Sequence, residues 1–370
     1  MRGRQRPRTI LSVVGARPNF MKLAPLARQL AARPTVKHVI VHTGQHYDAG
    51  MSDVFLRGLA IPRPDCNLAV GSASHAQQTA AIMQRFEVLC LRIQPDLVLV
   101  YGDVNSTLAA ALVAAKLGIR VAHVEAGLRS RDWSMPEEIN RVLTDRLSDL
   151  LFTPSRDAGE NLRAEGIPDE RIQFVGNIMI DSLVALLPEA RGRNGGRPAG
   201  APSEPYVVVT LHRPANVDHV ATLRQLLEAL SRLSQERAIV FPVHPRTRAR
   251  LRALGWSPGA ARVTLLDPAP YLDMLHLVLG SDLVITDSGG LQEETSYLGI
   301  PCLTVRPNTE RPITCSVGTN RLVAARSNAI CTAARAAWGR RRDPPPTIER
   351  WDGNAAARIV AVLCDRARMD

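Results

Sequence analysis

The apolar residues of the chain fall into short continuous runs that alternate with longer segments of mixed polarity. Runs of five or six residues, such as 97–101 and 238–243, are too short for a core helix and predict strands that are buried on both faces. The segments between them, such as 75–93, have a helical composition and end at glycine or proline. Alternating strands and helices of this kind predict a parallel, doubly wound α/β architecture.

The alternation of strands and helices occurs twice, which predicts two domains. In the first half we expect strands at 9–14, 36–41, 97–101, 120–124 and 150–152, the last of which should end the repeat, and a short strand at 172–175. In the second half we expect strands at 206–211, 238–243, 263–265, 283–286 and 302–305. A helix is also expected from about Met51. The predicted parts are a basic disordered arm (1–8), a first doubly wound domain (9–176) and a second doubly wound domain (177–353). A C-terminal helix (354–370) is expected to pack back on the first domain.

The charge balance raises the question of a nucleic-acid ligand, because the formal net charge is +11. The excess arginine is concentrated in the segments 2–8 and 335–342, without the interleaved aromatic residues of a base-stacking surface. We therefore expect solvated basic tails and no nucleic-acid partner. A basic protein nonetheless attracts an anionic small ligand.

The six cysteines show neither a CxxC pair nor the spacing of metal ligands, and several lie inside apolar runs. This pattern is typical of reduced core residues in a cytoplasmic protein, and we expect neither a metal nor a cofactor. The apolar run at 10–14 is too short for the core of a signal peptide, and no later run has the length of a membrane helix. The predicted location is the cytoplasm, without a membrane partner.

Three carboxylates stand where strands of the first half hand over to helices or loops. Asp103 follows the strand 97–101, Glu125 ends the strand 120–124, and Glu137 opens a helix directly after a proline. Side chains beyond the carboxyl ends of parallel strands are where α/β sheets bind ligands. The alternative is that these acids only cap helices or pair with nearby arginines, namely Arg129, Arg131 and Arg141. Their convergence with His123 and Arg129 within fifty residues favours a site.

Two strand–turn–helix junctions have the layout of an anion site. After the first strand, a glycine turn leads into a helix between Arg17 and Lys22, but neither GxGxxG nor GxxxxGK[ST] is present. A dinucleotide dehydrogenase and a P-loop NTPase are therefore not supported. In the second half, Asp287-Ser288-Gly289-Gly290 follows a buried strand and opens a helix, which suits a phosphate, and Glu294 could accept ribose hydroxyls. The alternative there is an ordinary tight turn with acidic residues in the first helical turn.

With these residues assembled, the chain resembles the non-hydrolysing UDP-N-acetylglucosamine 2-epimerase family over nearly its whole length. The matching stretches include GARPNFMKLAPL, GDVNST, HVEAGLRS, MPEEINRVLTDRLSDLLF, TLHRPANVD, TDSGGLQEE and NTERPITCSVGTN. The resemblance implies a glycosyltransferase-B-like fold, in which two Rossmann-like domains face a cleft that holds a UDP-sugar. It also implies a homodimer and a role in surface polysaccharide synthesis.

The resemblance also implies a reaction, the reversible conversion of UDP-GlcNAc to UDP-ManNAc at carbon 2. UDP is eliminated to give 2-acetamidoglucal and is added back after protonation of the opposite face. The implied catalytic residues are Asp103, Glu125, Glu137 and His212. The implied substrate contacts are Arg17, Lys22, Arg129, Arg213, Ser288, Gly289, Gly290, Glu294 and Arg311. Gln45, Gln78 and His244 match part of a second site at which UDP-GlcNAc activates some bacterial members, although Asp48 replaces a glutamine there.

Two departures from the family pattern leave the sugar open. The chain has HRPAN where the better-studied branch has HRREN or HRRES, and GDVNST where that branch has GDTTTT. Some similar relatives act on a UDP-2,3-diacetamido uronic acid, which is one alternative substrate. A hydrolytic epimerase, a glycosyltransferase of the same architecture and a non-catalytic UDP-sugar-binding protein are further alternatives. Loss of one of the three acids would favour the last, and none is lost.

Overall fold

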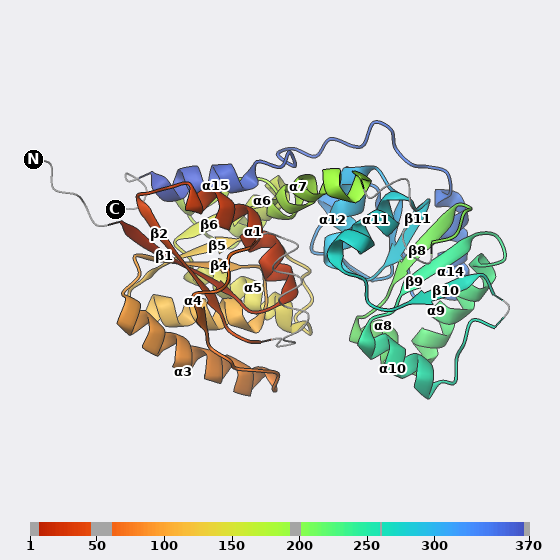
Figure 1. Cartoon of the computed structure of the whole chain (residues 1–370), viewed down its shortest axis with the longest axis horizontal. Helices are drawn as coiled ribbons and strands as arrows, with labels where there is room; N and C mark the ends of the chain where they lie inside the picture. Colours follow the sequence, from red (N-terminus) through yellow and green to blue (C-terminus); the bar gives the residue numbers. More distant parts are fainter. Residues whose placement is uncertain (1–6, 46–60, 193–200, 260, 366–370) are drawn as a thin grey trace, which may run out of the picture. The chain divides into compact units, whose positions relative to one another are not determined.

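The computed structural model describes residues 7–45, 61–192, 201–259 and 261–365, apart from the side chain of Arg17 (Figure 1). The chain divides into two compact units. Unit 1 comprises Met1–Ser182 and Glu349–Asp370, and unit 2 comprises Leu183–Ile348. The helix expected from about Met51 lies outside the described residues. No helix in the described ranges combines the length and the apolar character that crossing a membrane requires.

Unit 1 is built on a parallel sheet whose described strands have the order β3-β2-β1-β4-β5-β6-β7. The strands are β1 (Arg8–Val14), β2 (Val36–His42), β3 (Cys66–Asn67), β4 (Leu97–Tyr101), β5 (Arg120–Val124), β6 (Leu150–Thr153) and β7 (Ile172–Phe174). The helices are α1 (Arg17–Ala31), α3 (His75–Ile93), α4 (Asn105–Lys116), α5 (Pro136–Leu147), α6 (Arg156–Ala164), the 3₁₀ turn η1 (Asp169–Arg171) and α15 (Ala355–Cys364).

Helices cover both faces of this sheet, which explains why its central strands are continuous apolar runs. Every residue of β4 is fully buried. Figure 1 shows α3 and α4 on one side of the sheet and α1 and α15 on the other. Contacts of α4 with both α3 and α5 place these three helices in one layer. The predicted doubly wound architecture is confirmed.

Unit 2 repeats this architecture with a parallel sheet whose described strands have the order β10-β9-β8-β11-β12-β13. The strands are β8 (Tyr206–Thr210), β9 (Ala238–Pro242), β10 (Val263–Leu266), β11 (Leu283–Thr286), β12 (Cys302–Thr304) and β13 (Asn320–Leu322). The helices are α8 (Pro214–Val217), α9 (Val220–Leu233), α10 (Pro245–Ala253), α11 (Tyr271–Leu279), α12 (Gly289–Leu298), α13 (Ile313–Ser316) and α14 (Ser327–Ala337). One apolar core, formed mainly by β8, β9, β11, α9 and α14, lies inside this unit.

The chain passes from unit 1 to unit 2 within α7 (Ile178–Gly192) and returns after Ile348. The division therefore differs from boundaries at 176 and 353. The first turns of α7 stay with unit 1, where the Ser182 hydroxyl donates to the Met21 carbonyl oxygen at 2.5 Å. Trp351 is buried in unit 1 as well, and its indole donates to the Pro154 carbonyl oxygen at 3.1 Å. The C-terminal helix α15 packs against α1.

Two local expectations were wrong. The strand at 150–152 does not end the first repeat, because β7 pairs with β6 and extends the sheet by one strand. Arg8 is not part of an arm, because it begins β1 and its guanidinium donates to the Leu363 carbonyl oxygen at 3.1 Å. The residues before position 7 lie outside the described ranges.

The strand order reverses at one point in each sheet, between β1 and β4 in unit 1 and between β8 and β11 in unit 2. At such a point the connections leave the sheet in opposite directions and open a crevice outside the carboxyl ends of the strands. Ligands of open α/β sheets bind there. Asp103 follows β4, and Asp287-Ser288 follows β11.

Candidate active site

The reversal point of unit 1 is held together by Asn19, in the first turn of α1. Its side-chain oxygen accepts the backbone N–H groups of Gly15 and Ala16 at 3.2 and 3.1 Å, and its amide donates to the Tyr101 carbonyl oxygen at 2.8 Å. One buried side chain therefore joins the turn after β1 to the end of β4. This junction fixes the place where Asp103 leaves the sheet.

Lys22 and Glu125 form a buried ion pair at this reversal point. The ammonium Nζ lies 2.8 Å from Glu125 Oε1, and both residues are 4% exposed. Gly102 makes room for the lysine, because a Cβ at this position would lie 2.6 Å from Nζ. Glu125 itself has φ of 73°, a conformation that costs a residue with a side chain free energy. Such strain is concentrated at functional sites.

Asp103 is held by two residues of α5. Its carboxylate forms an ion pair with the buried Arg141, and its backbone carbonyl oxygen accepts a hydrogen bond from Asn140 at 2.9 Å. Arg141 also donates to Glu138 at 3.0 and 2.7 Å. From the sequence, Arg141 was one of three arginines that could pair with a strand-end acid. The structure shows this pair, because Arg141 reaches the Asp103 carboxylate from the first turns of α5.

The two neighbouring glutamates of α5 have opposite environments. Glu138 is buried and accepts hydrogen bonds from Ser130 N, Ser130 Oγ and Arg131 N at 3.0, 3.0 and 2.7 Å. Burial alone would raise the pKa of Glu138, but these N–H donors and Arg141 outweigh burial and hold the pKa below its usual range. Glu137 is exposed at the N-terminal turn, and no hydrogen bond or ion pair joins it to Asp103 or Glu125 in the described ranges.

Arg129 is committed to the interior of unit 1. Its guanidinium donates to Asp145 at 2.7 Å, to both oxygens of Glu165 at 2.7 Å, and to the Leu128 carbonyl oxygen at 2.8 Å. These hydrogen bonds use nearly all of its donors. The geometry favours a structural role over the substrate contact that the resemblance implied. The structure describes no side-chain position for Arg17.

Gln45 and Gln78 belong to one internal network. Ser106 donates to Gln45 Oε1 from its N–H and its hydroxyl at 3.1 and 2.7 Å, and the Gln78 amide donates to the Gln45 carbonyl oxygen at 3.2 Å. Asn105 donates to Gln78 Oε1 at 2.8 Å. Both glutamines are buried. The side-chain oxygens of both glutamines and the Gln78 amide nitrogen are therefore directed at protein groups in this structure.

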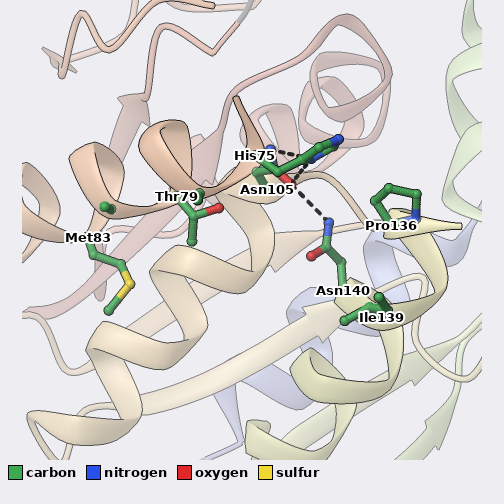
Figure 2. A pocket seen from close by; sticks show the side chains of 9 residues that line it. His75, Thr79, Met83, Asn105, Pro136, Ile139 and Asn140 are labelled. Carbon is green, nitrogen blue, oxygen red and sulfur yellow. Dashed lines mark hydrogen bonds between the residues drawn. The ribbon is translucent and has the colours of Figure 1, made fainter. Parts of the chain in front are cut away.

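A pocket of about 450 Å³ lies beside this network, between α3, α4 and α5. Figure 2 shows His75, Asn105 and Asn140 linked by hydrogen bonds at its wall. Asn140 also donates to the Asp103 carbonyl oxygen, so a residue of the pocket wall holds the backbone of that acid. The lining residues are His75, Ala76, Thr79, Ala80, Met83, Asn105, Pro136, Ile139 and Asn140.

The reversal point of unit 2 is organised by the fully buried Asp287. Its carboxylate accepts the backbone N–H groups of His212 and Arg213 at 3.1 and 3.0 Å, the Asn216 amide at 3.1 Å, and His212 Nδ1 at 2.9 Å. Burial would raise the pKa of Asp287, but the hydrogen bond and charge of His212 hold it below its usual range. Since Nδ1 faces Asp287, the partly exposed ring presents Nε2 to a ligand.

Three arginines surround Glu310 beside the N-terminus of α12. Arg306 NH1 lies 2.8 Å from Glu310 Oε2, Arg311 NH1 lies 2.8 Å from Oε1, and Arg213 NH2 lies 3.6 Å from Oε1. Arg311 also pairs with Glu293 at 2.8 Å. Burial, together with Arg213 and Arg311, lowers the pKa of Arg306. Sequence reasoning missed Arg306, because it lies in a Pro/Asn-rich loop after β12 without a motif.

Gly289 starts α12 against this arginine cluster. A Cβ at Gly289 would lie 2.8 Å from Arg311 NH1, so glycine permits the guanidinium to approach the helix N-terminus. Cationic side chains and the unpaired N–H groups of a first helical turn together suit a phosphate. One turn further along, Glu294 Oε1 accepts the Tyr271 hydroxyl at 2.9 Å. His244 is exposed at the start of α10, and its ring lies 5.7 Å from that of His212.

The family model described as UDP-N-acetylglucosamine 2-epimerase matches residues 28–364 of the chain. This match begins within α1, after β1, and includes the other strands of unit 1 and the whole sheet of unit 2. The chain belongs to the UDP-N-acetylglucosamine 2-epimerase family. The resemblance stated from the sequence motifs is thereby confirmed.

Relatives of this epimerase with assigned activities match over most of the chain. The UDP-2,3-diacetamido-2,3-dideoxy-D-glucuronate 2-epimerase of Pseudomonas aeruginosa is 42% identical over 96% of this chain and 99% of its own. A UDP-N-acetylglucosamine 2-epimerase of Methanococcus maripaludis is also 42% identical, over 84% of this chain and 86% of its own. The identity values therefore do not separate the two substrates.

Solved structures of the family match this epimerase closely. The Methanocaldococcus jannaschii UDP-GlcNAc 2-epimerase in complex with UDP-GlcNAc and UDP has a TM-score of 0.89 at 38% identity, covering 96% of this chain and 99% of that one. The Neisseria meningitidis enzyme bound to UDP-GlcNAc has a TM-score of 0.87 at 30% identity, covering 96% and 99%. The predicted glycosyltransferase-B-like fold of two Rossmann-like units is confirmed.

Proposed function

We propose that this epimerase inverts carbon 2 of a UDP-N-acetylhexosamine and that its first substrate is UDP-GlcNAc, which it converts to UDP-ManNAc. The observation that carries the proposal is the arrangement of Asp103 and Glu125 at the ends of the neighbouring strands β4 and β5. The register pairs Tyr101 with Val124, so the two acids stand just beyond one edge of the sheet. An inversion needs such a pair, because a proton leaves one face of the sugar and another arrives at the opposite face.

The proposed chemistry is an elimination followed by an addition. A carboxylate takes the proton from carbon 2, the C1–O bond breaks with its electron pair on the phosphate oxygen, and a C1=C2 double bond forms. A second acid then gives a proton to the other face of carbon 2 while the phosphate oxygen rejoins carbon 1. Asp103, Glu125 and Glu137 are the candidates, and their partners differ: Arg141 for Asp103, Lys22 for Glu125, and solvent for Glu137.

Unit 2 would hold the departing UDP. Charge develops on the β-phosphate as C1–O breaks, and donors already directed at that oxygen stabilise the transition state. The proposed donors are His212 Nε2, the Ser288 hydroxyl, the N–H groups of Gly289 and Gly290, and the guanidinium groups of Arg213 and Arg311. The Ser288 N–H itself donates to the Thr286 hydroxyl at 2.9 Å. Glu294 would bind the ribose, with Tyr271 fixing one of its oxygens at 2.9 Å.

A second candidate substrate is UDP-2,3-diacetamido-2,3-dideoxy-D-glucuronate. The observation that favours it is the Pseudomonas aeruginosa relative, which carries that substrate in its name and matches over 99% of its own length. A uronate adds a carboxylate to the sugar, and the arginine cluster of unit 2 is a source of cations that could bind it. A hydrolytic reaction would instead release free UDP and ManNAc.

The test is a comparison of the two UDP-sugars under identical conditions, followed by proton NMR. Our proposal predicts an equilibrium mixture of UDP-GlcNAc and UDP-ManNAc, without free UDP accumulating. Conversion of the diacetamido uronate alone would replace the substrate and keep the reaction. Accumulation of UDP and free ManNAc would identify a hydrolytic epimerase, and no conversion of either sugar would contradict the proposal.

A homodimer and substrate activation remain predictions, and so does the cytoplasmic location. Large exposed apolar side chains of unit 1 lie on two helices of one layer: Val88 and Leu91 on α3, and Ile139 and Leu143 on α5, with exposures of 67%, 61%, 39% and 46%. These residues support a second copy of the chain as the occupant of that face. The residues that the resemblance implies for activation by a UDP-sugar are Gln45, Gln78 and His244.

A further inference from the structure

His123 and Asp145 form a buried pair that has no role in the chemistry proposed above. His123 lies on β5 and is 0% exposed, and Asp145 lies on α5 and is 1% exposed. His123 Nδ1 lies 2.6 Å from Asp145 Oδ1. Burying two ionisable groups costs desolvation free energy that a hydrophobic pair of the same size would not cost. The contacts of this pair are therefore informative.

The hydrogen bonds of the pair use both ring nitrogens of His123. His123 Nε2 lies 2.7 Å from the Gly102 carbonyl oxygen, which can only accept, so Nε2 carries a hydrogen. Asp145 also accepts Arg129 NH1 at 2.7 Å and the Gly127 N–H at 3.0 Å through Oδ2. Burial would raise the pKa of Asp145, but its interactions with His123 and Arg129 hold it below its usual range, so the carboxylate accepts hydrogen bonds in this network.

The hydrogen bonds of His123 and Asp145 reach both turns that carry the candidate acids. Gly102 directly precedes Asp103, and Gly127 stands two residues after Glu125. Asp145 therefore holds the Glu125 turn directly, through the Gly127 N–H, and holds the Asp103 turn through the histidine ring. A single carboxylate on α5 thereby fixes the distance between two separate strand-end turns.

The same helix holds Asp103 from its side chain as well. Arg141 pairs with the Asp103 carboxylate and stands one helical turn before Asp145, on the same face of α5. Asp145 is itself anchored, because Arg129 bonds both it and Glu165. A satisfied buried network of this kind is rigid and selects one geometry.

We propose that His123 and Asp145 are a positioning pair, which sets the Asp103 turn against the Glu125 turn so that both acids reach carbon 2 of one bound sugar. The inference rests on the proposed function, because it takes Asp103 and Glu125 as the proton-transfer residues. The pair itself touches no substrate. Its loss should slow proton transfer and leave UDP binding intact.

Two substitutions at His123 separate the two hydrogen bonds. His123→Asn places an amide nitrogen near the position of Nδ1 and loses the bond to Gly102. His123→Gln places its nitrogen near the position of Nε2 and can keep the bond to Gly102. We expect His123→Asn to lower kcat by about 10²-fold, with KM within about threefold, because misplacing a general acid or base costs most of its contribution. We expect His123→Gln to recover at least about a tenth of wild-type kcat, because the bond to Gly102 is the one that reaches the Asp103 turn and Asp145 keeps its own bond to the Gly127 N–H.

The control variant is His38→Asn. His38 lies on β2, where its Nε2 is 2.8 Å from the Ser12 hydroxyl, and it has no bond to either acid-bearing turn. Its kcat should stay within about twofold of wild type. Turnover is expressed per UDP-binding site, measured by calorimetry, so that unfolded protein does not count. Equal loss in His123→Asn and His123→Gln, a loss confined to KM, or failure of both variants to bind UDP would overturn the inference.

The double variant of His123→Asn with Asp103→Asn distinguishes this inference from the proposed function. If His123 acts through Asp103, the double variant should be no slower than Asp103→Asn alone. In Asp103→Asn the carboxyl group is already gone, so changing its position has no further effect on the rate. A further loss of about 10²-fold in the double variant would contradict positioning. Wild-type turnover in Asp103→Asn would refute the proposed role of Asp103, whereas wild-type turnover in His123→Asn alone would refute only this inference.

Discussion

The Lys22 ammonium lies 2.8 Å from the Glu125 carboxylate, and neither residue is more than 4% exposed. Removing one partner of a buried ion pair leaves the other charge without compensation. Lys22→Met should therefore lower the free energy of unfolding by about 3–5 kcal/mol. Urea unfolding, followed by circular dichroism, measures the change. Adding Glu125→Gln to this variant should restore part of the loss, and a double variant less stable than Lys22→Met would contradict the account.

Gly102 should not tolerate a side chain. It has φ of 61°, and an added Cβ would lie 2.6 Å from Lys22 Nζ, so Gly102→Ala must displace the lysine from Glu125. We expect turnover to fall by at least about tenfold, since a small displacement of a catalytic group is costly. The matched control is Gly118→Ala, where φ is 70° and nothing lies within 4 Å of the added Cβ. Similar turnover in both variants would show that backbone strain alone explains the effect.

The neighbouring glutamates of α5 should separate activity from stability. Glu137 is exposed, so Glu137→Gln should leave the thermal midpoint unchanged and lower kcat by about 10²-fold. Glu138 is 1% exposed and pairs with Arg141, so Glu138→Gln should lower the thermal midpoint by several degrees. Calorimetry and a UDP-ManNAc assay on both variants test this. Normal turnover in Glu137→Gln would remove Glu137 from the scheme.

Asp181 makes the attachment of α15 dependent on pH. Burial raises the pKa of Asp181 to about 6. The hydrogen bonds from the backbone N–H groups of Ala356 and Ala355 lower this pKa and only partly offset burial. A carboxyl group whose pKa is raised in the folded state stabilises the fold at low pH, and this contribution is lost as the pH rises through about 6. The stability of wild type relative to Asp181→Asn should therefore fall between about pH 4 and pH 6 and level off above about pH 6, as thermal midpoints would show. A constant difference would contradict this.

The α3–α5 face should be the surface of a dimer. Leu91 is 61% exposed in the single chain, and Leu91→Asp places a charge on this apolar face. The substitution should shift the protein from dimer to monomer, as light scattering would show. Val220→Asp is the matched control, because Val220 is 51% exposed but lies on α9 of unit 2. A monomeric wild type, or dissociation of both variants, would exclude this face as the specific interface.

The central strands were predictable because burial on both faces leaves few polar positions in them. The runs at 97–101 and 120–124 coincide with β4 and β5, and the helix at 75–93 coincides with α3. The two-residue strand β3 and the one-turn helices α8 and α13 are too short to have a period, so a pattern search does not find them. The helix α14 was overlooked, because part of it was interpreted as a basic tail.

Side-chain partners were less predictable than their places along the chain. The motifs put Asp103 and Glu125 at strand ends, but which cation meets which acid depends on the packing of α1 and α5. Arg129 has the same sequence context as a ligand-binding arginine and is instead bonded to Asp145 and Glu165. Arg306 had no sequence signal, since its importance arises only from its distance to Glu310.

The central claim is that Asp103 and Glu125 move the proton at carbon 2 while unit 2 holds UDP. Deuterium incorporation from heavy water tests it most directly, with UDP-GlcNAc as substrate and proton NMR as the measurement. We predict UDP-ManNAc deuterated at carbon 2 with the wild type, and a rate at least about 10²-fold lower with Asp103→Asn or Glu125→Gln, both of which still bind UDP. UDP-ManNAc without deuterium at carbon 2, or full exchange in either variant, would contradict the account.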